Sequence, residues 1–236
     1  MTHPTPKNCL IFEVSGRYAL FTDPLTRVGG EKCSYHIPTY EALKGISESI
    51  YWKPTFTWII DKVRLMEPVR TEAKNMKPIN LSGGNSLATY TYLSKVRYQV
   101  LAHFEWNLHR ADLADDRDEG KHFNVAQRML KKGGRRDIFL GTRECQGYVG
   151  SCEFDSGEGA HDAAGEIAYG LMFHGFDYPD TIGKPELHGR FWHAVVRDGI
   201  IEFPRPDAPT ITRKFIREMT ANPPKSVGLK EKGLLS

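Results

Sequence analysis

Three residues of types that can together cleave an RNA strand lie in two separate segments of the chain. Tyr51 follows "SESI", and Lys121 and His122 are neighbours in "DEGKH". RNA carries its own nucleophile, because the 2′-OH attacks the adjacent phosphate once a base removes its proton and a cation stabilises the new charge. A His can be that base or the acid, a Lys can stabilise the phosphorane, and a Tyr can orient the 2′-OH. The products would be a 2′,3′-cyclic phosphate and a 5′-OH.

The same positions also have plain structural interpretations. Lys121 and His122 fall at the start of a predicted helix, where the dipole disfavours cations, and pairing with Asp118 and Glu119 would offset that cost. Tyr51 ends a helical stripe of polar residues, and a Tyr at a helix end is most often a half-buried packing residue with a wet hydroxyl. The other members of that stripe are Tyr40, Lys44 and Ser47. Both interpretations stay open on these grounds.

The charge pattern changes abruptly around this predicted helix. Residues 112–119 hold five carboxylates and one Arg, whereas residues 128–143 hold six Lys or Arg and one Asp. Basic residues in the last helical turn complement the dipole, which is sufficient to explain Lys131 and Lys132. The three Arg residues beyond the helix have no such explanation and suit phosphate contact. The candidate RNA-binding residues are these three, Arg135, Arg136 and Arg143, together with Lys44 of the polar stripe on the first predicted helix.

Composition bounds the class of protein. The 236-residue chain has a formal net charge of only +3, so any affinity for nucleic acid must come from local clusters. The four Cys residues form no CxxC pair, and no window reaches the roughly 20 apolar residues that span a bilayer. "MTHPTPKN" lacks the apolar stretch of a signal peptide, so we expect a cytoplasmic protein with reduced thiols.

No metal or other cofactor is expected. "DLADDRDEG" is rich in carboxylates, but counted from Asp115 it has Arg117 at the third and Ala126 at the twelfth position of an EF-hand loop. We expect this loop to be solvated. The nine His residues are scattered, with neither an HExxH motif nor a Cys–His zinc spacing.

The predicted elements follow the order β-α-β-β-α-β. Apolar and β-branched runs predict strands at 8–21, 55–69, 88–108 and 137–154. The second and third of these are expected to pair around a turn at 82–85. Helical spacing predicts helices at 38–52 and 121–132, and a long loop is expected at 22–36. This order is typical of an α+β, ferredoxin-like (RRM-like) fold, with two helices on one face of a four-stranded antiparallel sheet. We expect that domain at 1–154, and a small antiparallel β-rich extension of shorter strands with a polar tail at 155–236.

Long blocks of the chain resemble a known family. They are "YALFTDPLTRVGGEKCSYHIPTYEALKGISESIYWKP", "GGNSLATYTYLSKVRYQVLAHFEWNLHRADLADDRDEGKH" and "GGRRDIFLGTRECQGYV". Together they resemble the CRISPR-associated endoribonuclease of subtype I-C (Dvulg), of the Cas5 family in the RAMP superfamily, over roughly residues 9–207. The resemblance implies a ferredoxin-like domain with a small β-sheet extension, in agreement with the pattern above.

The resemblance also implies an activity and a site. Members of the family cut precursor CRISPR RNA at the 3′ base of the repeat hairpin without a metal. They then keep the 5′ handle bound and join the large and backbone subunits of the type I-C interference complex. The family's catalytic Tyr corresponds to Tyr51, and its Lys-His pair to Lys121 and His122. We expect His122 as general base or acid, Lys121 as phosphate stabiliser and Tyr51 as orienting group. The alternatives are a non-catalytic RNA-binding subunit and a metal-dependent DNA nuclease.

Overall fold

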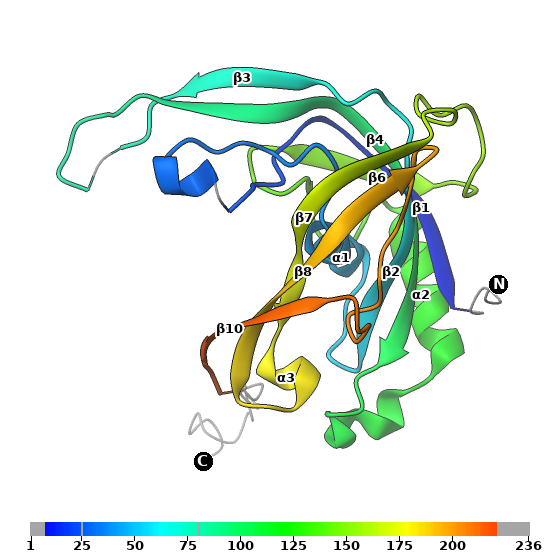
Figure 1. Cartoon of the computed structure of the whole chain (residues 1–236). Helices are drawn as coiled ribbons and strands as arrows, with labels where there is room; N and C mark the ends of the chain where they lie inside the picture. Colours follow the sequence, from blue (N-terminus) through cyan, green and yellow to red (C-terminus); the bar gives the residue numbers. More distant parts are fainter. Residues whose placement is uncertain (1–7, 25, 80, 221–236) are drawn as a thin grey trace, which may run out of the picture.

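The computed structural model describes residues 8–24, 26–79 and 81–220, and the polar tail expected at the C-terminus lies mostly outside these residues. One ten-stranded antiparallel sheet with few helices makes up the described part of the chain (Figure 1). The elements of the first half are β1 (Cys9–Ala19), η1 (Thr26–Gly29), α1 (Tyr40–Ile50), β2 (Phe56–Leu65), β3 (Thr71–Met76), β4 (Ala88–Trp106) and η2 (Ala111–Asp116). Those of the second half are α2 (Glu119–Lys131), β5 (Ile138–Phe139), β6 (Gln146–Ser151), β7 (Glu166–Asp177), α3 (Pro179–Ile182), β8 (Glu186–Arg197), β9 (Ile200–Glu202) and β10 (Thr212–Glu218).

The centre of the sheet consists of strands that pair in the order β6-β1-β4-β2, each antiparallel to its neighbour. α1 packs on β2 and α2 packs on β1 and β6, and the two helices also touch each other. Apolar side chains that alternate along these strands form the core beneath the helices. They include the fully buried Phe12, Val14, Trp58 and Val100.

Both predicted helices exist, with shifted starts. α1 begins after Thr39, whose side-chain oxygen accepts a hydrogen bond from Ala42 N–H at 3.3 Å. α2 begins two residues earlier than predicted, because Asp118 caps it by accepting a hydrogen bond from Lys121 N–H at 2.9 Å. Asp and Thr are favoured caps since their side chains satisfy a free N–H of the first turn. The caps fix where the chain enters each helix.

The antiparallel pairing expected between the strands at 55–69 and 88–108 is confirmed, but an extra strand, β3, precedes the turn at 82–85, so this turn connects β3 to β4. β3 pairs with residues 88–93 of β4, whereas β2 pairs with residues 98–106 of the same strand. β4 changes partner around Lys95, whose positive φ of 53° interrupts the regular strand. The segment "TEAKNM" has few β-branched residues and is largely exposed, so its composition gave no strand signal. β3 and the first part of β4 form an arm that projects from the molecule (Figure 1).

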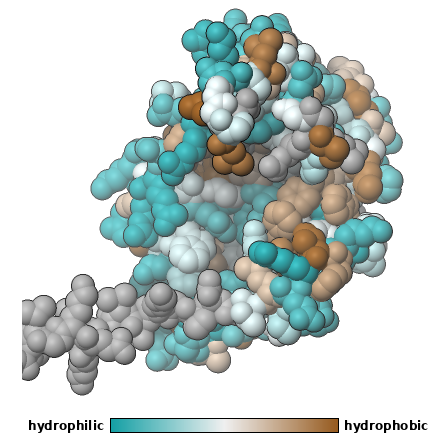
Figure 2. Space-filling view, turned by 90° about the vertical axis from the view of Figure 1, so that its left-hand side faces the viewer, coloured by the Kyte–Doolittle hydropathy of each residue, from teal (hydrophilic) through white to brown (hydrophobic). Residues whose placement is uncertain are grey.

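The end of the arm exposes apolar side chains. Ile79, Leu81 and Leu87 are at least 70% exposed. Figure 2 looks onto the side of the molecule from which the arm projects, and it shows apolar residues above a hollow in this face. An exposed apolar group of this kind is more typical of a contact surface than of a solvated hairpin.

The strands after residue 155 are longer than expected. β7 and β8 have 12 residues each, and register shifts next to Gly170 and Gly175 mark bulges inside β7 rather than its ends. β10 is a further strand that the sequence pattern did not indicate. β9 pairs with both β2 and β8, so these strands continue the central sheet. No helix in the described ranges is long and apolar enough to cross a membrane.

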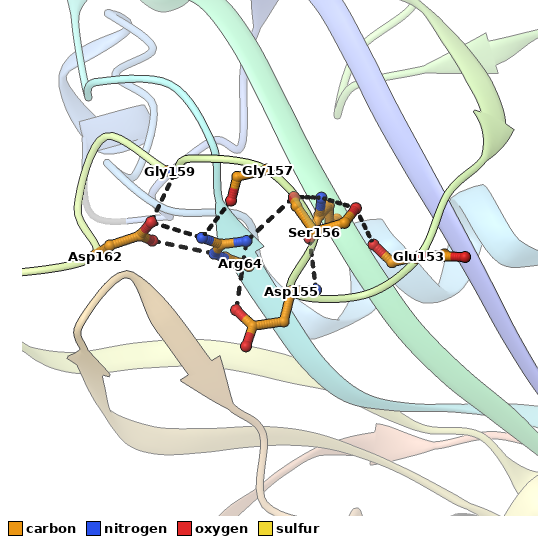
Figure 3. A network of polar contacts seen from close by, with 8 residues as sticks. Arg64, Glu153, Asp155, Ser156, Gly157, Gly159 and Asp162 are labelled. Carbon is orange, nitrogen blue, oxygen red and sulfur yellow. Dashed lines mark hydrogen bonds and ion pairs between the residues drawn. The ribbon is translucent and has the colours of Figure 1, made fainter.

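The connection between β6 and β7 is fastened to the sheet by a buried arginine (Figure 3). Arg64 of β2 is 4% exposed and donates hydrogen bonds to both carboxylate oxygens of Asp162, at 3.1 and 2.6 Å. It also donates to the carbonyl oxygens of Ser156 and Gly157, and Gln99 of β4 donates to the former at 2.8 Å. The guanidinium thus satisfies backbone acceptors that would otherwise be buried without a donor.

Candidate active site

Tyr51 is positioned by the end of α1. It is the C-cap residue, its N–H donates to Ser47 O at 3.0 Å, and its extended backbone directs the chain away from the helix axis. The Trp58 indole N–H donates to the carbonyl oxygen of Tyr51 at 2.7 Å. The backbone N–H groups of Arg135 and Arg136 donate to Ser49 O at the end of α1. The bonds to Ser49 join the end of α1 to the segment after α2 and so fix the position of one helix end relative to the other.

The structure brings Tyr51 and His122 into direct contact. The hydroxyl oxygen of Tyr51 lies 2.9 Å from Nδ1 of His122, and Nε2 of the same ring lies 2.7 Å from the carbonyl oxygen of Asp116. A carbonyl oxygen only accepts hydrogen bonds, so Nε2 carries the proton. In the neutral ring Nδ1 is then the acceptor, and Tyr51 donates its hydroxyl proton to it. His122 is therefore oriented as a base toward Tyr51.

Aromatic rings enclose the His122 side chain. Its ring centroid lies 5.3 Å from that of Phe56, 5.8 Å from that of Trp106 and 6.4 Å from that of Phe104. The His122 side chain has no exposed surface, and Tyr51 is 4% exposed. RNA cannot touch the imidazole in this conformation. Any proton that His122 exchanges with a substrate must pass through Tyr51 or follow a local opening.

Asp116 connects the charged residues of the site. One carboxylate oxygen accepts from Lys121 Nζ at 2.6 Å and the other from the Thr55 hydroxyl at 2.7 Å. These hydrogen bonds lower the pKa of Asp116 to about 2, so the carboxylate is ionised at neutral pH. Its second oxygen also lies 3.4 Å from Nε2 of His122. Asp116 thus fixes Lys121, His122 and the preceding loop together.

This arrangement corrects two expectations. The acidic loop was expected to be solvated, yet the Asp116 side chain is bonded on both oxygens and 29% exposed. Asp118 and Glu119 were the expected partners of Lys121, but Asp118 caps α2 by accepting the Lys121 backbone N–H with its side-chain Oδ1, and the Lys121 ammonium pairs with Asp116. The 3-10 turn η2 brings the loop back against α2. Several neighbouring Asp residues have the same chemistry, so the sequence did not distinguish Asp116 or reveal Thr55.

Electrostatics keep Tyr51 protonated and Lys121 charged. Burial raises the pKa of Tyr51, and so does Asp116, whereas the charges of Lys121 and Arg135 lower it. The hydrogen bond to Asp116 raises the pKa of Lys121. Lys121 is 53% exposed, so its ammonium is the part of the site most open to an incoming phosphate.

The four candidate RNA-binding residues lie in different surroundings. Arg135 is exposed, and its charge acts on Tyr51; the charge of Arg136 acts on Glu48 of α1. Arg143 is exposed between β5 and β6, 6.0 Å from the centroid of the Phe139 ring. The Lys44 side chain is only 12% exposed, and its Nζ lies between Glu41 and Glu48 at 3.8 and 3.7 Å. The structure therefore brings Arg135 near the site and gives Lys44 two carboxylate neighbours.

Comparison with known proteins identifies the family. The model of the CRISPR-associated Cas5 proteins (Cas5d) matches residues 9–204. The chain belongs to the Cas5 family. This confirms the resemblance seen in the sequence. The described residues contain no group of three or more His, Cys, Asp or Glu side chains arranged to hold a metal ion.

Curated proteins and solved structures are similar to this chain, three of them over most of its length. A protein of Thermus thermophilus named CRISPR pre-crRNA endoribonuclease Cas5d is 30% identical over 216 residues, which are 81% of this chain and 90% of the relative. A protein of the same name from Mannheimia succiniciproducens is 39% identical over 66 residues, 28% of each chain. A crystal structure described as a CRISPR-associated protein has a TM-score of 0.72 and 35% identity, and covers 86% of this chain and 96% of its own. A functionally uncharacterized protein from Streptococcus mutans has a TM-score of 0.67 and 36% identity, with the same coverage.

Proposed function

We propose that this protein is an endoribonuclease that cleaves precursor CRISPR RNA within the repeat, at the base of its hairpin, without a metal ion. The names of the curated Cas5 relatives support the substrate class and the type of reaction. The observation that carries the chemistry is the hydrogen bond from the Tyr51 hydroxyl to Nδ1 of His122. It joins a proton donor that keeps 4% of its surface exposed to a base that has no exposed surface.

The proposed reaction uses Tyr51 as the group in contact with the 2′-OH. As the 2′-oxygen attacks phosphorus, its proton passes to the Tyr51 oxygen while the hydroxyl proton of Tyr51 passes to Nδ1 of His122. The bond from phosphorus to the 5′-oxygen breaks, water supplies the proton to that oxygen, and a 2′,3′-cyclic phosphate and a 5′-OH result. His122 then returns its proton through the Tyr51 hydroxyl to the hydroxide left by that water. The backbone carbonyl of Asp116 holds the other nitrogen of the imidazole and would stabilise the imidazolium that forms. This assignment gives Tyr51 a larger role than the orienting one expected from the sequence.

Lys121 would stabilise the charge on the phosphorane. Its ammonium donates a hydrogen bond to Asp116 at 2.6 Å, so a phosphate must replace that carboxylate as the partner of the ammonium. Water screens exposed ion pairs of this kind and they contribute little to stability, so exchanging the carboxylate for a phosphate costs little free energy. Arg135 would contact the adjacent backbone phosphate, with Arg136, Arg143 and Lys44 as further RNA-binding residues.

After cleavage the protein would keep the 5′ handle bound and join the large and backbone subunits of the type I-C interference complex, in the cytoplasm. The ferredoxin-like assignment for residues 1–154 rests on the antiparallel order β6-β1-β4-β2, which supports it. The proposed boundary to a β-rich extension at 155–236 falls in the connection between β6 and β7, held by Arg64.

A second function, that of an RNA-binding subunit without catalysis, is favoured by one observation. Both nitrogens of His122 are engaged and its side chain is fully buried, as expected for a structural histidine.

One experiment separates the two functions. Purified protein is incubated with its repeat RNA in excess EDTA, and the product ends are analysed by mass spectrometry. The proposal predicts cleavage with a 2′,3′-cyclic phosphate. Tight binding with intact RNA would instead assign the non-catalytic role, and cleavage that EDTA abolishes would show that a metal is required.

A further inference from the structure

A cavity of about 480 Å³ adjoins the candidate active site. It lies between β2, the end of β4, α3 and the C-terminal strands, and Trp106 is part of its lining. The centroid of the Trp106 ring is 5.8 Å from that of His122, so one side chain contacts both the cavity and the buried imidazole. The volume is within the range of small-ligand pockets, roughly 300–1,000 Å³.

Two buried donor groups whose protons have no acceptor belong to residues that line this cavity. Arg190 is 5% exposed, and within the described residues its Nε has no hydrogen-bond acceptor. The proton of the Tyr40 hydroxyl, which is fully buried, has no acceptor there either. Burial raises the pKa of Tyr40, so its hydroxyl keeps the proton that it can donate. Because buried polar groups are nearly always hydrogen-bonded, two unpaired donors in one cavity indicate a ligand with acceptor atoms.

The charges around the cavity favour a neutral ligand. Arg205 donates to both carboxylate oxygens of Glu105, at 2.8 and 3.0 Å. Arg190 and Arg213 are both bonded to Asp177. Each of these guanidinium groups already has a carboxylate, so a phosphate would meet neutralised cations and nearby acids. The lining also includes the aromatic rings of Trp106 and Phe176. Flat heteroaromatic groups that accept hydrogen bonds fit this combination.

We propose that the cavity binds the base of one unpaired nucleotide beside the cleaved bond. Nucleobases in single-stranded RNA are recognised by stacking on aromatic side chains and by hydrogen bonds to their edges. Guanine is the preferred base, since its O6 and N7 both accept hydrogen bonds, whereas adenine presents a donor in place of O6. The placement beside the cut rests on the proposed function; the presence of a base site does not.

The substitution Tyr40→Phe tests the site with little risk to the fold. The Tyr40 ring stacks on His174 with centroids 4.0 Å apart, and Phe keeps this contact while removing only the hydroxyl. A structural role alone would change the unfolding free energy without changing the affinity for guanosine. Thr181→Trp, on α3 at the cavity lining, fills the space instead. Tyr169→Phe removes a hydroxyl outside the cavity and is the matched control.

Calorimetric titration of the full chain with guanosine, adenosine and inorganic phosphate gives the first readout. Guanosine should bind about tenfold more tightly than adenosine, and phosphate should not bind. Tyr40→Phe should weaken guanosine binding about tenfold, Thr181→Trp should abolish it, and Tyr169→Phe should leave it unchanged. Absence of guanosine binding, or equal binding by the wild type and Tyr40→Phe, overturns the proposal.

Repeat RNA with single abasic substitutions gives the second readout. One abasic position near the cut should weaken binding to the wild type and have no effect on Tyr40→Phe, since the two changes remove the same contact. If guanosine binds but no abasic position shows this coupling, the cavity serves a free nucleoside and its assignment to RNA is wrong. The proposed function has a separate test: RNA that stays intact in the EDTA assay would refute it, whether or not guanosine binds.

Discussion

The substitution Tyr51→Phe removes the single atom on which the proposed proton transfer depends. The Tyr51 hydroxyl is 2.9 Å from Nδ1 of His122, and the phenyl ring that remains can keep the packing against Phe56. A positioned acid or base contributes about 10²- to 10⁴-fold to a rate, which corresponds to about 2.7–5.4 kcal/mol of activation free energy. We expect the cleavage rate to fall by that factor.

The same change has a stability cost that must be measured alongside. Without the hydroxyl, Nδ1 of the fully buried His122 has no donor, and an unsatisfied buried acceptor costs about 1–3 kcal/mol of unfolding free energy. The variant should therefore unfold at lower urea while its m-value stays unchanged. The cleavage assay belongs at a temperature where both proteins are fully folded.

The assay is single-turnover cleavage of repeat RNA at saturating protein, with RNA affinity measured separately. Affinity should be unchanged, because Tyr51 is 4% exposed and offers little binding surface. Tyr148→Phe, at an exposed position of β6, is the matched control and should cleave like the wild type. A folded Tyr51→Phe protein that cleaves within about threefold of the wild-type rate would refute the reasoning, because it would show that no proton passes through this hydroxyl.

Three further predictions concern charged residues. Lys121→Met should lower the cleavage rate about 10²-fold or more and leave the unfolding free energy nearly unchanged, since its ion pair is exposed; equal cleavage rates would remove Lys121 from the mechanism. Arg64→Met should lower the unfolding free energy, measured in urea, by about 3 kcal/mol. This is the lower end of the range for breaking a buried ion pair, because Asp162 is partly exposed. A loss of unfolding free energy below about 1 kcal/mol would contradict this prediction. Burial lowers the pKa of His103, but hydrogen bonds to Asp61 and Glu105 outweigh it and raise the pKa above its ordinary value of about 6.5. This stabilisation is complete below the unfolded pKa and is lost as pH rises through the folded one, so His103→Gln should be more destabilising at pH of about 5 than at about 9, and equal losses would refute the assignment.

The sequence was most informative where local chemistry decides the structure. Helical spacing and capping residues located α1 and α2 to within about two residues, as is usual for such signals. The predicted placement of two helices side by side on one face of the sheet allowed Tyr51 and His122 to approach each other, and the structure brings them to 2.9 Å. The resemblance to the Cas5 family indicated that these residues are catalytic.

Features that depend on tertiary contacts were missed. β3 is a mostly exposed strand whose pairing is provided by β4, so its own composition carried no signal. The extension was expected to hold shorter strands, whereas β7 continues through two bulges next to Gly170 and Gly175 while it pairs with β8. Asp116 reaches Lys121 only because η2 turns the loop back, and no spacing rule distinguishes it from the neighbouring acids.

The central claim is cleavage by the RNA's own 2′-OH at the Tyr51 and His122 pair. The most direct test is single-turnover cleavage in EDTA of two repeat RNAs that differ only by a 2′-deoxy substitution at the mapped cut. The account predicts cleavage of the unmodified RNA and none of the deoxy RNA, with equal binding of both. Cleavage of the deoxy RNA at the same bond would contradict it, because water or another nucleophile would then be attacking the phosphate.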